Sequence, residues 1–199
     1  ELNPLTRLRH LLHAHPTLGP LVVLIIMYAF FAWQSERFLS PFNMSLIVQQ
    51  VTIVGTLAVG QTIIILTAGI DLSVGAIMVL SSVVMGQFTF RYGLPPEIAV
   101  ACGLACGAIC GYINGWLVAV MKLPPFIVTL GMWQIILATN FLYSANETIR
   151  SQEIAEQAPL LQLFGEKFTI GGAVFTYGVI FFIALVFVAF TVTEVVSYL

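Results

Sequence analysis

Six long apolar segments, separated by short polar ones, set the pattern of the chain. They cover about residues 18–34, 46–68, 72–90, 97–121, 126–143 and 172–192. Each approaches or exceeds the ~18 apolar residues that indicate a helix crossing a membrane. The pattern therefore predicts an all-α polytopic membrane protein, a bundle of about six transmembrane helices over residues 18–192.

The connection between the second and third segments is short and carries a charge. Asp71 and Ser73 lie between Gly69 and Gly75, with no room for a water-exposed loop. A charge at the centre of a span costs at least ~2.5 kcal/mol on translocon scales, so it needs a partner, a cap role or a wet cavity. We expect a broken-helix connection at Gly69–Gly75, with the glycines as hinges and Asp71 in a polar niche. A simpler and compatible alternative is that Asp71 or Ser73 caps the third helix.

Polar residues also recur inside the predicted helices. Gln50 and Gln61 are about three helical turns apart and share a face, and Thr129 and Asn140 repeat this spacing in the fifth segment. Such groups either form interhelical hydrogen bonds, worth ~0.6 kcal/mol on average in membranes, or line a polar passage. The second interpretation predicts a translocation path lined by Gln61, Asp71, Ser73, Asn114 and Thr129.

Small residues form two stripes on the fourth predicted helix. Glycines recur at four-residue spacing, at Gly103, Gly107, Gly111 and Gly115. This ladder predicts that another helix backbone approaches closely there. The neighbouring stripe is Cys102, Cys106 and Cys110, which could suggest a metal. No histidine or further cysteine lies near it in the sequence, so packing is the favoured interpretation.

Residues 144–171 differ from the rest because charges concentrate there and long apolar runs are few. This segment is either an inert loop or a docking surface for a soluble partner, for which we name Glu147, Arg150, Glu153 and Glu156. Residues 1–17 are polar and basic and are predicted to be a tail. The basic flank of the first helix favours a cytoplasmic N-terminus, whereas the count over all loops does not.

Composition agrees with a membrane protein and excludes several other classes. The 199 residues are 59% hydrophobic and 8% charged, against roughly 25% charged in soluble domains. A net charge of −2 and seven scattered Lys and Arg residues argue against a nucleic-acid partner. The sequence contains no G-x-x-x-x-G-K-[ST], H-E-x-x-H or G-x-S-x-G motif. We therefore expect neither an enzyme nor a bound cofactor or metal.

Three strings carry a family resemblance. The chain reads GQTIIILTAGIDLSVGA, then INGWLVAVMKLPPFIVTLGMW, then YSANETIRSQEI. These strings resemble the permease subunit of bacterial sugar ABC importers of the ribose and xylose class, and are most similar to the fructose-type permeases. The G-I-D-L-S-V-G string is specific, and the resemblance covers about residues 18–190.

The resemblance implies a multi-pass permease of the bacterial inner membrane that passes a monosaccharide inward by alternating access. It implies a second permease copy, identical or paired, cytoplasmic ABC ATPase subunits and a periplasmic sugar-binding protein as partners. It also implies a cytoplasmic tail at residues 1–17 and a periplasmic loop at residues 144–171. Asp71 and Ser73 fall on the acid and the hydroxyl of the family motif.

The sequence departs from the family in one respect, and two alternative functions remain open. The family continues after the sixth span with a basic cytoplasmic segment, whereas residues 193–199 read TEVVSYL, so we expect a truncated C-terminal end that cannot couple ATP hydrolysis to transport. An ion- or proton-coupled secondary transporter would instead use Asp71 as its titrating group. A membrane scaffold packed through the glycine ladder would transport nothing.

Overall fold

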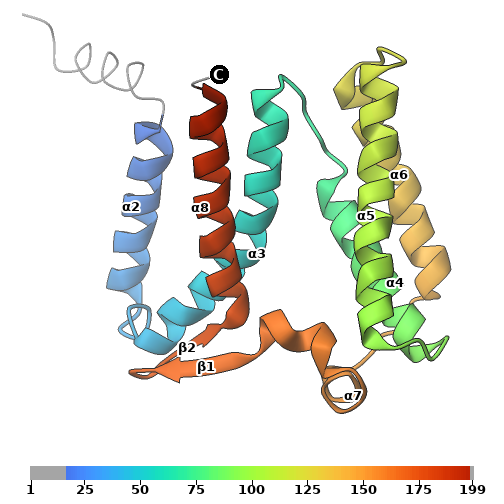
Figure 1. Cartoon of the computed structure of the whole chain (residues 1–199). Coiled ribbons are helices and arrows are strands. Elements are labelled where there is room, and N and C mark those ends of the chain that lie inside the picture. The colour runs from blue at the N-terminus through green and yellow to red at the C-terminus, as the bar shows by residue number, and fades with distance from the viewer. Residues whose placement is uncertain (1–16, 198–199) are drawn as a thin grey trace, which may run out of the picture. The chain divides into compact units, whose positions relative to one another are not determined.

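The computed structural model describes residues 17–197, so the predicted tail lies almost wholly outside the described residues. The elements follow in the order α2 (Leu18–Gln34), α3 (Pro41–Leu66), α4 (Val74–Phe90), α5 (Pro96–Ala119), α6 (Pro125–Ser144), α7 (Ser151–Gln157), η1 (Pro159–Gly165), β1 (Lys167–Ile170), β2 (Ala173–Thr176) and α8 (Tyr177–Ser197) (Figure 1).

Each of the six apolar segments contains a long helix, which confirms the predicted fold class. Among the described residues, α3, α5, α6 and α8 are long and apolar enough to cross a membrane. The helices α2 and α4 are apolar but shorter, with 17 residues each. At 1.5 Å per residue such a helix is ~25 Å long, which is at the lower limit for a span.

The helix α3 begins at Pro41, five residues before the predicted start. Proline is tolerated at the first helical position because its missing N–H would have no partner there. The backbone N–H of Asn43 donates to the Ser40 hydroxyl at 3.3 Å, which satisfies one free amide of the first turn. The Ser-Pro pair is the N-terminal signal that the sequence analysis took for a loop.

A two-stranded hairpin of β1 and β2 precedes α8 and was not predicted. Gly171 and Gly172 both have positive φ, 57° and 84°, as a tight two-residue hairpin turn requires. The prediction that the sixth span begins near residue 172 was therefore wrong, since α8 begins at Tyr177. The Gly-Gly pair between Lys167–Ile170 and Ala173–Thr176 was the missed signal.

The described chain forms two compact units, and the smaller comprises residues 17–47 and 169–174. In this unit the Tyr28 hydroxyl donates to Met44 Sδ at 3.1 Å. The Phe38 ring packs edge-on against Tyr28 and is stacked near Phe31, with centroid distances of 5.1 and 5.7 Å. These contacts fix the turn between α2 and α3.

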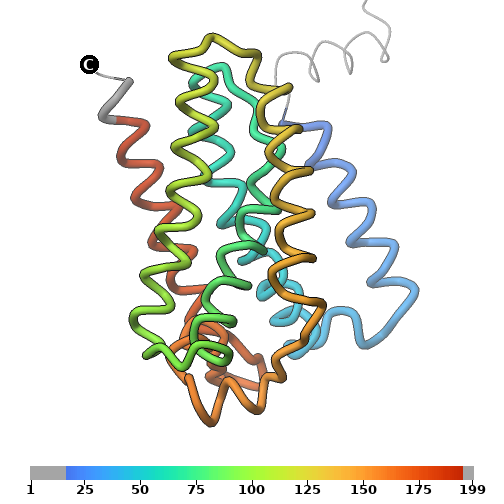
Figure 2. The backbone as a smooth tube through the Cα atoms, turned by 90° about the vertical axis from the view of Figure 1, so that its right-hand side faces the viewer, coloured from blue at the N-terminus to red at the C-terminus, as the bar shows by residue number. Residues whose placement is uncertain are grey.

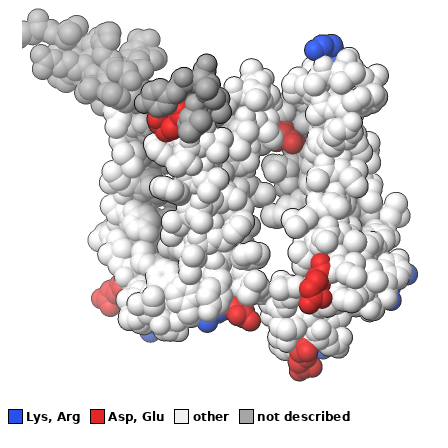
Figure 3. Space-filling view, viewed as in Figure 1, with Lys and Arg blue, Asp and Glu red and all other residues white. Residues whose placement is uncertain are grey.

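The larger unit comprises residues 48–168 and 175–197, and α4, α5 and α6 lie side by side within it (Figures 1 and 2). Its buried apolar centre is Ala76, Leu80 and Ile136, with Cys106 and Cys110 packed against it. Over these three helices, Figure 3 shows charged side chains near the two ends and a broad uncharged band between them. This distribution suits helices that cross an apolar layer.

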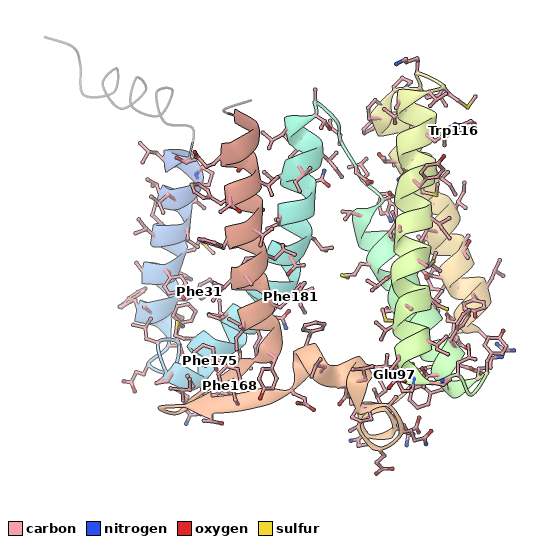
Figure 4. The ribbon with its side chains drawn as sticks, viewed as in Figure 1. Phe31, Glu97, Trp116, Phe168, Phe175 and Phe181 are labelled. Carbon is pink, nitrogen blue, oxygen red and sulfur yellow. The ribbon has the colours of Figure 1, made fainter. Side chains whose placement is uncertain are left out.

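The ends of the helices in this unit carry residues suited to a membrane surface. Figure 4 places Glu97 and Trp116 toward opposite ends of α5. Glu97 lies in the first turn, where its negative charge interacts favourably with the helix dipole. The short helix η1 contacts α5, α7 and α8, and its Phe164 ring lies 5.0 Å from that of Phe181. This segment closes one end of the unit.

Candidate functional site

The connection between α3 and α4 is a helix stop without a glycine hinge. The N–H of Ala68 bonds to the carbonyl of Ile65 at 2.9 Å, and that of Gly69 to the carbonyl of Ile64 at 3.0 Å. This is the Schellman pattern, and the residue in the left-handed region is Ala68, with φ 58°. The prediction that the two glycines are hinges was wrong: neither has a positive φ, and Gly75 lies inside α4.

Gly69 is needed for space instead. A Cβ atom at this position would lie 3.2 Å from the carbonyl oxygen of Ile64 and 3.0 Å from its Cγ2 atom. Contacts this short force the neighbouring atoms to move. The glycine therefore permits the close return of the chain that brings Asp71 to the start of α4.

Asp71 organises the N-terminus of α4. Its Oδ1 atom accepts hydrogen bonds from the Ser73 backbone N–H at 2.7 Å and from the Ser73 hydroxyl at 2.6 Å. Ser73 occupies the N-cap position, is fully buried, and makes no side-chain cap bond of its own. Asp71 itself is half-buried. The carboxylate thus holds the turn that leads into the helix and remains at the surface of a cavity, but neither Asp71 nor Ser73 makes the side-chain cap bond to the helix that the cap alternative predicted.

Residues of α5 and α6 reach this turn from two sides. The Asn114 amide donates from Nδ2 to the Ser73 hydroxyl at 2.8 Å, and Asn114 is only 5% exposed. The Thr129 hydroxyl lies 2.9 Å from the carbonyl of Pro125 and 3.2 Å from that of Ile70. The connection is therefore attached to both neighbouring helices by hydrogen bonds.

A cavity of about 300 Å³, here called the Asp71 cavity, opens beside these groups. Three of the five residues predicted to line a path contribute to its wall, namely Asp71, Asn114 and Thr129. Ser73 is buried behind them and Gln61 lies outside the wall. The Gln61 Oε1 atom is buried without a hydrogen-bond partner. The path roles of all five remain predictions.

The spacing of Thr129 and Asn140 placed them on one face, and the structure puts both on the buried side of α6. Thr129 is 3% and Asn140 7% exposed. Asn140 Nδ2 lies 3.5 Å from the carbonyl of Ala76 in α4. These side chains therefore serve at least as interhelical contacts.

The glycine ladder of α5 divides into two halves. A Cβ atom on Gly103 would lie 2.9 Å from the Ser81 carbonyl, and one on Gly107 would lie 3.1 Å from the Ser81 hydroxyl. Gly111 and Gly115 instead line the Asp71 cavity, and no described atom lies within 4 Å of a Cβ placed there. Close packing against α4 is thus a feature of the first half, while the packing role of the second half stays a prediction.

The described cysteines and the residues that line the Asp71 cavity indicate neither catalysis nor metal binding. The three cysteines are free, and the described residues hold no group of His, Cys, Asp and Glu that could bind a metal. What the Asp71 cavity offers is a carboxylate, an amide and a hydroxyl. Such groups bind a polar solute by hydrogen bonds without reacting with it.

The four residues named for docking are all exposed. Glu147 and Arg150 lie between α6 and α7, and Glu153 and Glu156 lie on α7. The structure brings them to the end of the unit opposite the Asp71 cavity, beside the C-terminal end of α4 (Figure 1). Their partner remains a prediction.

Sequence reasoning missed one buried polar residue at that end. Gln87 is 4% exposed, and its Oε1 atom has no hydrogen-bond partner. The available signal was a single amide inside the apolar run from Val83 to Phe88. Arg91 follows four residues later on the same helical face, and this spacing was the signal that could have identified Gln87.

Comparison with known proteins gives the family. The family described as the permease component of branched-chain amino acid transport systems matches residues 43–195. The chain is 63% identical over 183 residues to the fructose import permease protein FrcC of Rhizobium meliloti, covering 92% of this chain and 51% of that protein. It is 40% identical over 132 residues to the ribose import permease protein RbsC of Bacillus subtilis (strain 168), covering 66% and 41%.

A third relative is the xylose transport system permease protein XylH of Escherichia coli (strain K12), 39% identical over 112 residues, covering 56% of this chain and 28% of the relative. The chain spans about half the length of the fructose permease and less of the other two. No solved structure gives a significant match. The profile match over most of the chain, together with the apolar helices, means that this protein belongs to the family of membrane permease components of branched-chain amino acid transport systems.

Proposed function

We propose that the chain forms part of the membrane permease of a bacterial ABC importer that carries a monosaccharide across the inner membrane. The observation that carries this proposal is the 63% identity to a fructose import permease over nearly the whole chain. Two further relatives of this chain, whose names specify ribose and xylose, point to the same class of small neutral sugars.

The geometry of the Asp71 cavity supports a sugar as the solute. Monosaccharides present hydroxyl groups that both donate and accept, and Asp71, Asn114 and Thr129 offer matching acceptors and donors. The volume of about 300 Å³ is near the lower end of ligand pockets, as a single small molecule requires. A few scattered polar groups bind a sugar weakly, which suits a passage that must also release it.

We further propose the partners that an importer of this kind needs. These are a second permease copy, cytoplasmic ATPase subunits and a periplasmic sugar-binding protein. With a cytoplasmic N-terminus, α4 runs outward, so the Asp71 cavity faces the cytoplasmic half and residues 144–165 face the periplasm. The exposed Glu147, Arg150, Glu153 and Glu156 are then available to the binding protein.

The test is a chimaeric permease in which this chain replaces the matching half of the fructose permease FrcC. We expect the chimaera to restore uptake of labelled D-fructose to a strain that lacks its own permease but keeps the ATPase and binding protein. A chimaera that reaches the membrane at the normal level without restoring uptake of D-fructose, D-ribose or D-xylose contradicts the proposal.

Two treatments separate ATP-driven uptake from the proton-coupled alternative. Depletion of ATP should abolish uptake by the chimaera, while an uncoupler applied at constant ATP should leave it unchanged. The reverse pattern would favour a secondary transporter in which Asp71 titrates.

A further inference from the structure

A buried amide with an unmet hydrogen bond lies at the C-terminal end of α4. Gln87 is 4% exposed, and its Oε1 atom has no partner among the described residues. An unsatisfied buried acceptor is unfavourable, so such groups in folded proteins normally bind a water molecule or a ligand. Gln61, Asn114 and Asn140 also have an unpaired amide oxygen, so the case for a ligand at Gln87 depends on the cavities beside it.

Two cavities flank this side chain. One, of about 270 Å³, is lined by Gln87, Phe90, Arg91, Glu147 and Ile149. The other, of about 410 Å³, shares Gln87, Glu147 and Ile149 with the first and extends toward α7 and η1. We call the first of these the Gln87 pocket. Both cavities lie between the end of α4 and the segment that follows α6, and Gln87, Glu147 and Ile149 contribute to both walls.

The chemistry of the Gln87 pocket selects a neutral polar ligand. Its wall carries one cation, Arg91, one anion, Glu147, and one neutral amide, Gln87. Opposite charges in one small wall give no net attraction for either a phosphate or a metal cation. They do offer donors and acceptors side by side, as adjacent hydroxyl groups require, and Phe90 adds apolar surface.

The backbone around Glu147 is held in an unusual conformation. Ala145 and Asn146 both have positive φ, 53° and 58°, although neither is a glycine. The Glu147 N–H closes this turn by donating to the Ser144 carbonyl at 2.9 Å. Such conformations persist where the surrounding structure enforces them, and they cluster at binding sites.

A glycine allows this segment to lie against α4. A Cβ atom on Gly86 would be 2.9 Å from the Ile149 Cδ1 atom, so a larger residue would displace that side chain. Ile149 and Glu147 therefore reach the wall of the Gln87 pocket because position 86 carries no side chain.

We propose that the Gln87 pocket is a binding site for a neutral monosaccharide, which it receives before the sugar moves toward the Asp71 cavity. This inference rests on the proposed function, which puts the pocket on the periplasmic face. Gln87 and Glu147 accept from sugar hydroxyls, and Arg91 donates to one. The exposed charges of α7 begin a few residues beyond Glu147, so a docked binding protein would release its sugar beside the pocket.

The test is photoaffinity labelling of the chimaeric permease, which carries the complete chain, in lipid nanodiscs. The probe is a diazirine derivative of D-fructose, and labelled peptides are identified by mass spectrometry. We expect labels within residues 82–91 and 144–149, removed by an excess of unlabelled D-fructose. We expect Gln87→Leu to lower this labelling by roughly tenfold, the order for losing a hydrogen bond to a ligand.

Thr89→Val is the matched control. The Thr89 hydroxyl is also buried without a partner on the same helix, but Thr89 does not line the pocket. This variant should keep the full labelling. If Gln87→Leu does not fold, Glu147→Gln and Arg91→Gln decide the matter, because both residues are exposed and each should lower labelling.

Three results would overturn the proposal. They are labels that avoid both segments, labels that Gln87→Leu leaves unchanged when it folds, and labels removed by sodium phosphate but not by D-fructose. Transport by the chimaera without labelling here would refute the site and keep the proposed function. Labelling here without transport of any of the three sugars would refute the proposed function and keep the site.

Discussion

The two ends of α4 lie beside similar buried amides that differ in how they are hydrogen-bonded to neighbouring side chains. At the N-terminal end, Asp71, Ser73 and Asn114 bond to one another, with three hydrogen bonds of 2.6 to 2.8 Å. At the C-terminal end, Gln87 is as deeply buried as Asn114, and the amide oxygens of both side chains have no partner, but Asn114 also donates from Nδ2 to the Ser73 hydroxyl. The N-terminal end is thus fixed by hydrogen bonds between its own side chains, while an amide oxygen with unmet bonding capacity remains at both ends.

This difference shows why burial alone does not identify a binding site. A buried polar group whose bonds are made stabilises the fold, whereas one whose bonds are unmade is unfavourable until a ligand arrives. Removing the first should damage the protein, and removing the second should damage binding only. The predictions that follow separate these two cases.

The largest effect is expected from Asp71→Ala. The change removes the acceptor of two hydrogen bonds from Ser73, and bonds to a charged group are worth ~1.5 kcal/mol or more each. We expect a loss of ~3 kcal/mol in stability, seen as a lower thermal unfolding temperature and a lower membrane level of the chimaera.

Glu153→Ala is the control for this variant, because Glu153 is exposed on α7 and should change stability little. Asp71→Asn keeps an acceptor at Oδ1, so it should restore most of the stability and test whether the charge matters for uptake. Wild-type protein level and wild-type uptake in Asp71→Ala would show that the central role given to Asp71 is wrong.

The glycine ladder offers a second comparison along the same helix pair. In Gly103→Ala the new Cβ atom would meet the Ser81 carbonyl at 2.9 Å and Met85 Cγ at 2.5 Å, so α4 and α5 must separate. We expect a loss of ~2 kcal/mol, as for overpacking in a core, measured by thermal unfolding in detergent.

Gly111→Ala should instead be neutral or slightly stabilising. Nothing described lies within 4 Å of the added Cβ atom, and alanine favours the helix by ~1 kcal/mol over glycine. Equal destabilisation by the two variants would mean that the second half of the ladder also packs against a helix, such as one of a second copy.

Asn114→Leu and Gln87→Leu test the comparison most directly. The first removes the donor to the Ser73 hydroxyl and should lower stability by ~1 kcal/mol. The second removes an amide whose oxygen is unpaired and should leave stability unchanged or raise it. Equal losses in thermal unfolding would indicate that Gln87 is a structural residue after all.

The smallest effect is expected at the end of α3. Ala68 has φ 58°, a conformation that costs an alanine roughly 1 kcal/mol and a glycine almost nothing. Ala68→Gly should therefore raise the thermal unfolding temperature slightly. Ala108→Gly, in the middle of α5, should lower it, and a lower value for both variants would show that Ala68 makes contacts worth more than its strain.

Several features of the fold could be predicted because they depend on local chemistry. Apolar length predicted the six helices, and the fifth apolar segment, expected at residues 126–143, matches α6 within one residue at each end. The start of α3 and the hairpin before α8 were missed although Ser40, Pro41 and the Gly171–Gly172 pair signalled them.

The sequence by itself determined that this is a helical membrane protein with a lone acid at a broken connection, because hydropathy and charge act over short stretches of chain. Only the tertiary structure decided which polar groups are satisfied. Asn114 and Gln87 look alike in the sequence, and the amide oxygens of both are buried without a partner, yet Asn114 Nδ2 bonds to the Ser73 hydroxyl at 2.8 Å. Hydrogen bonds across 41 residues depend on how helices pack, which no local pattern records.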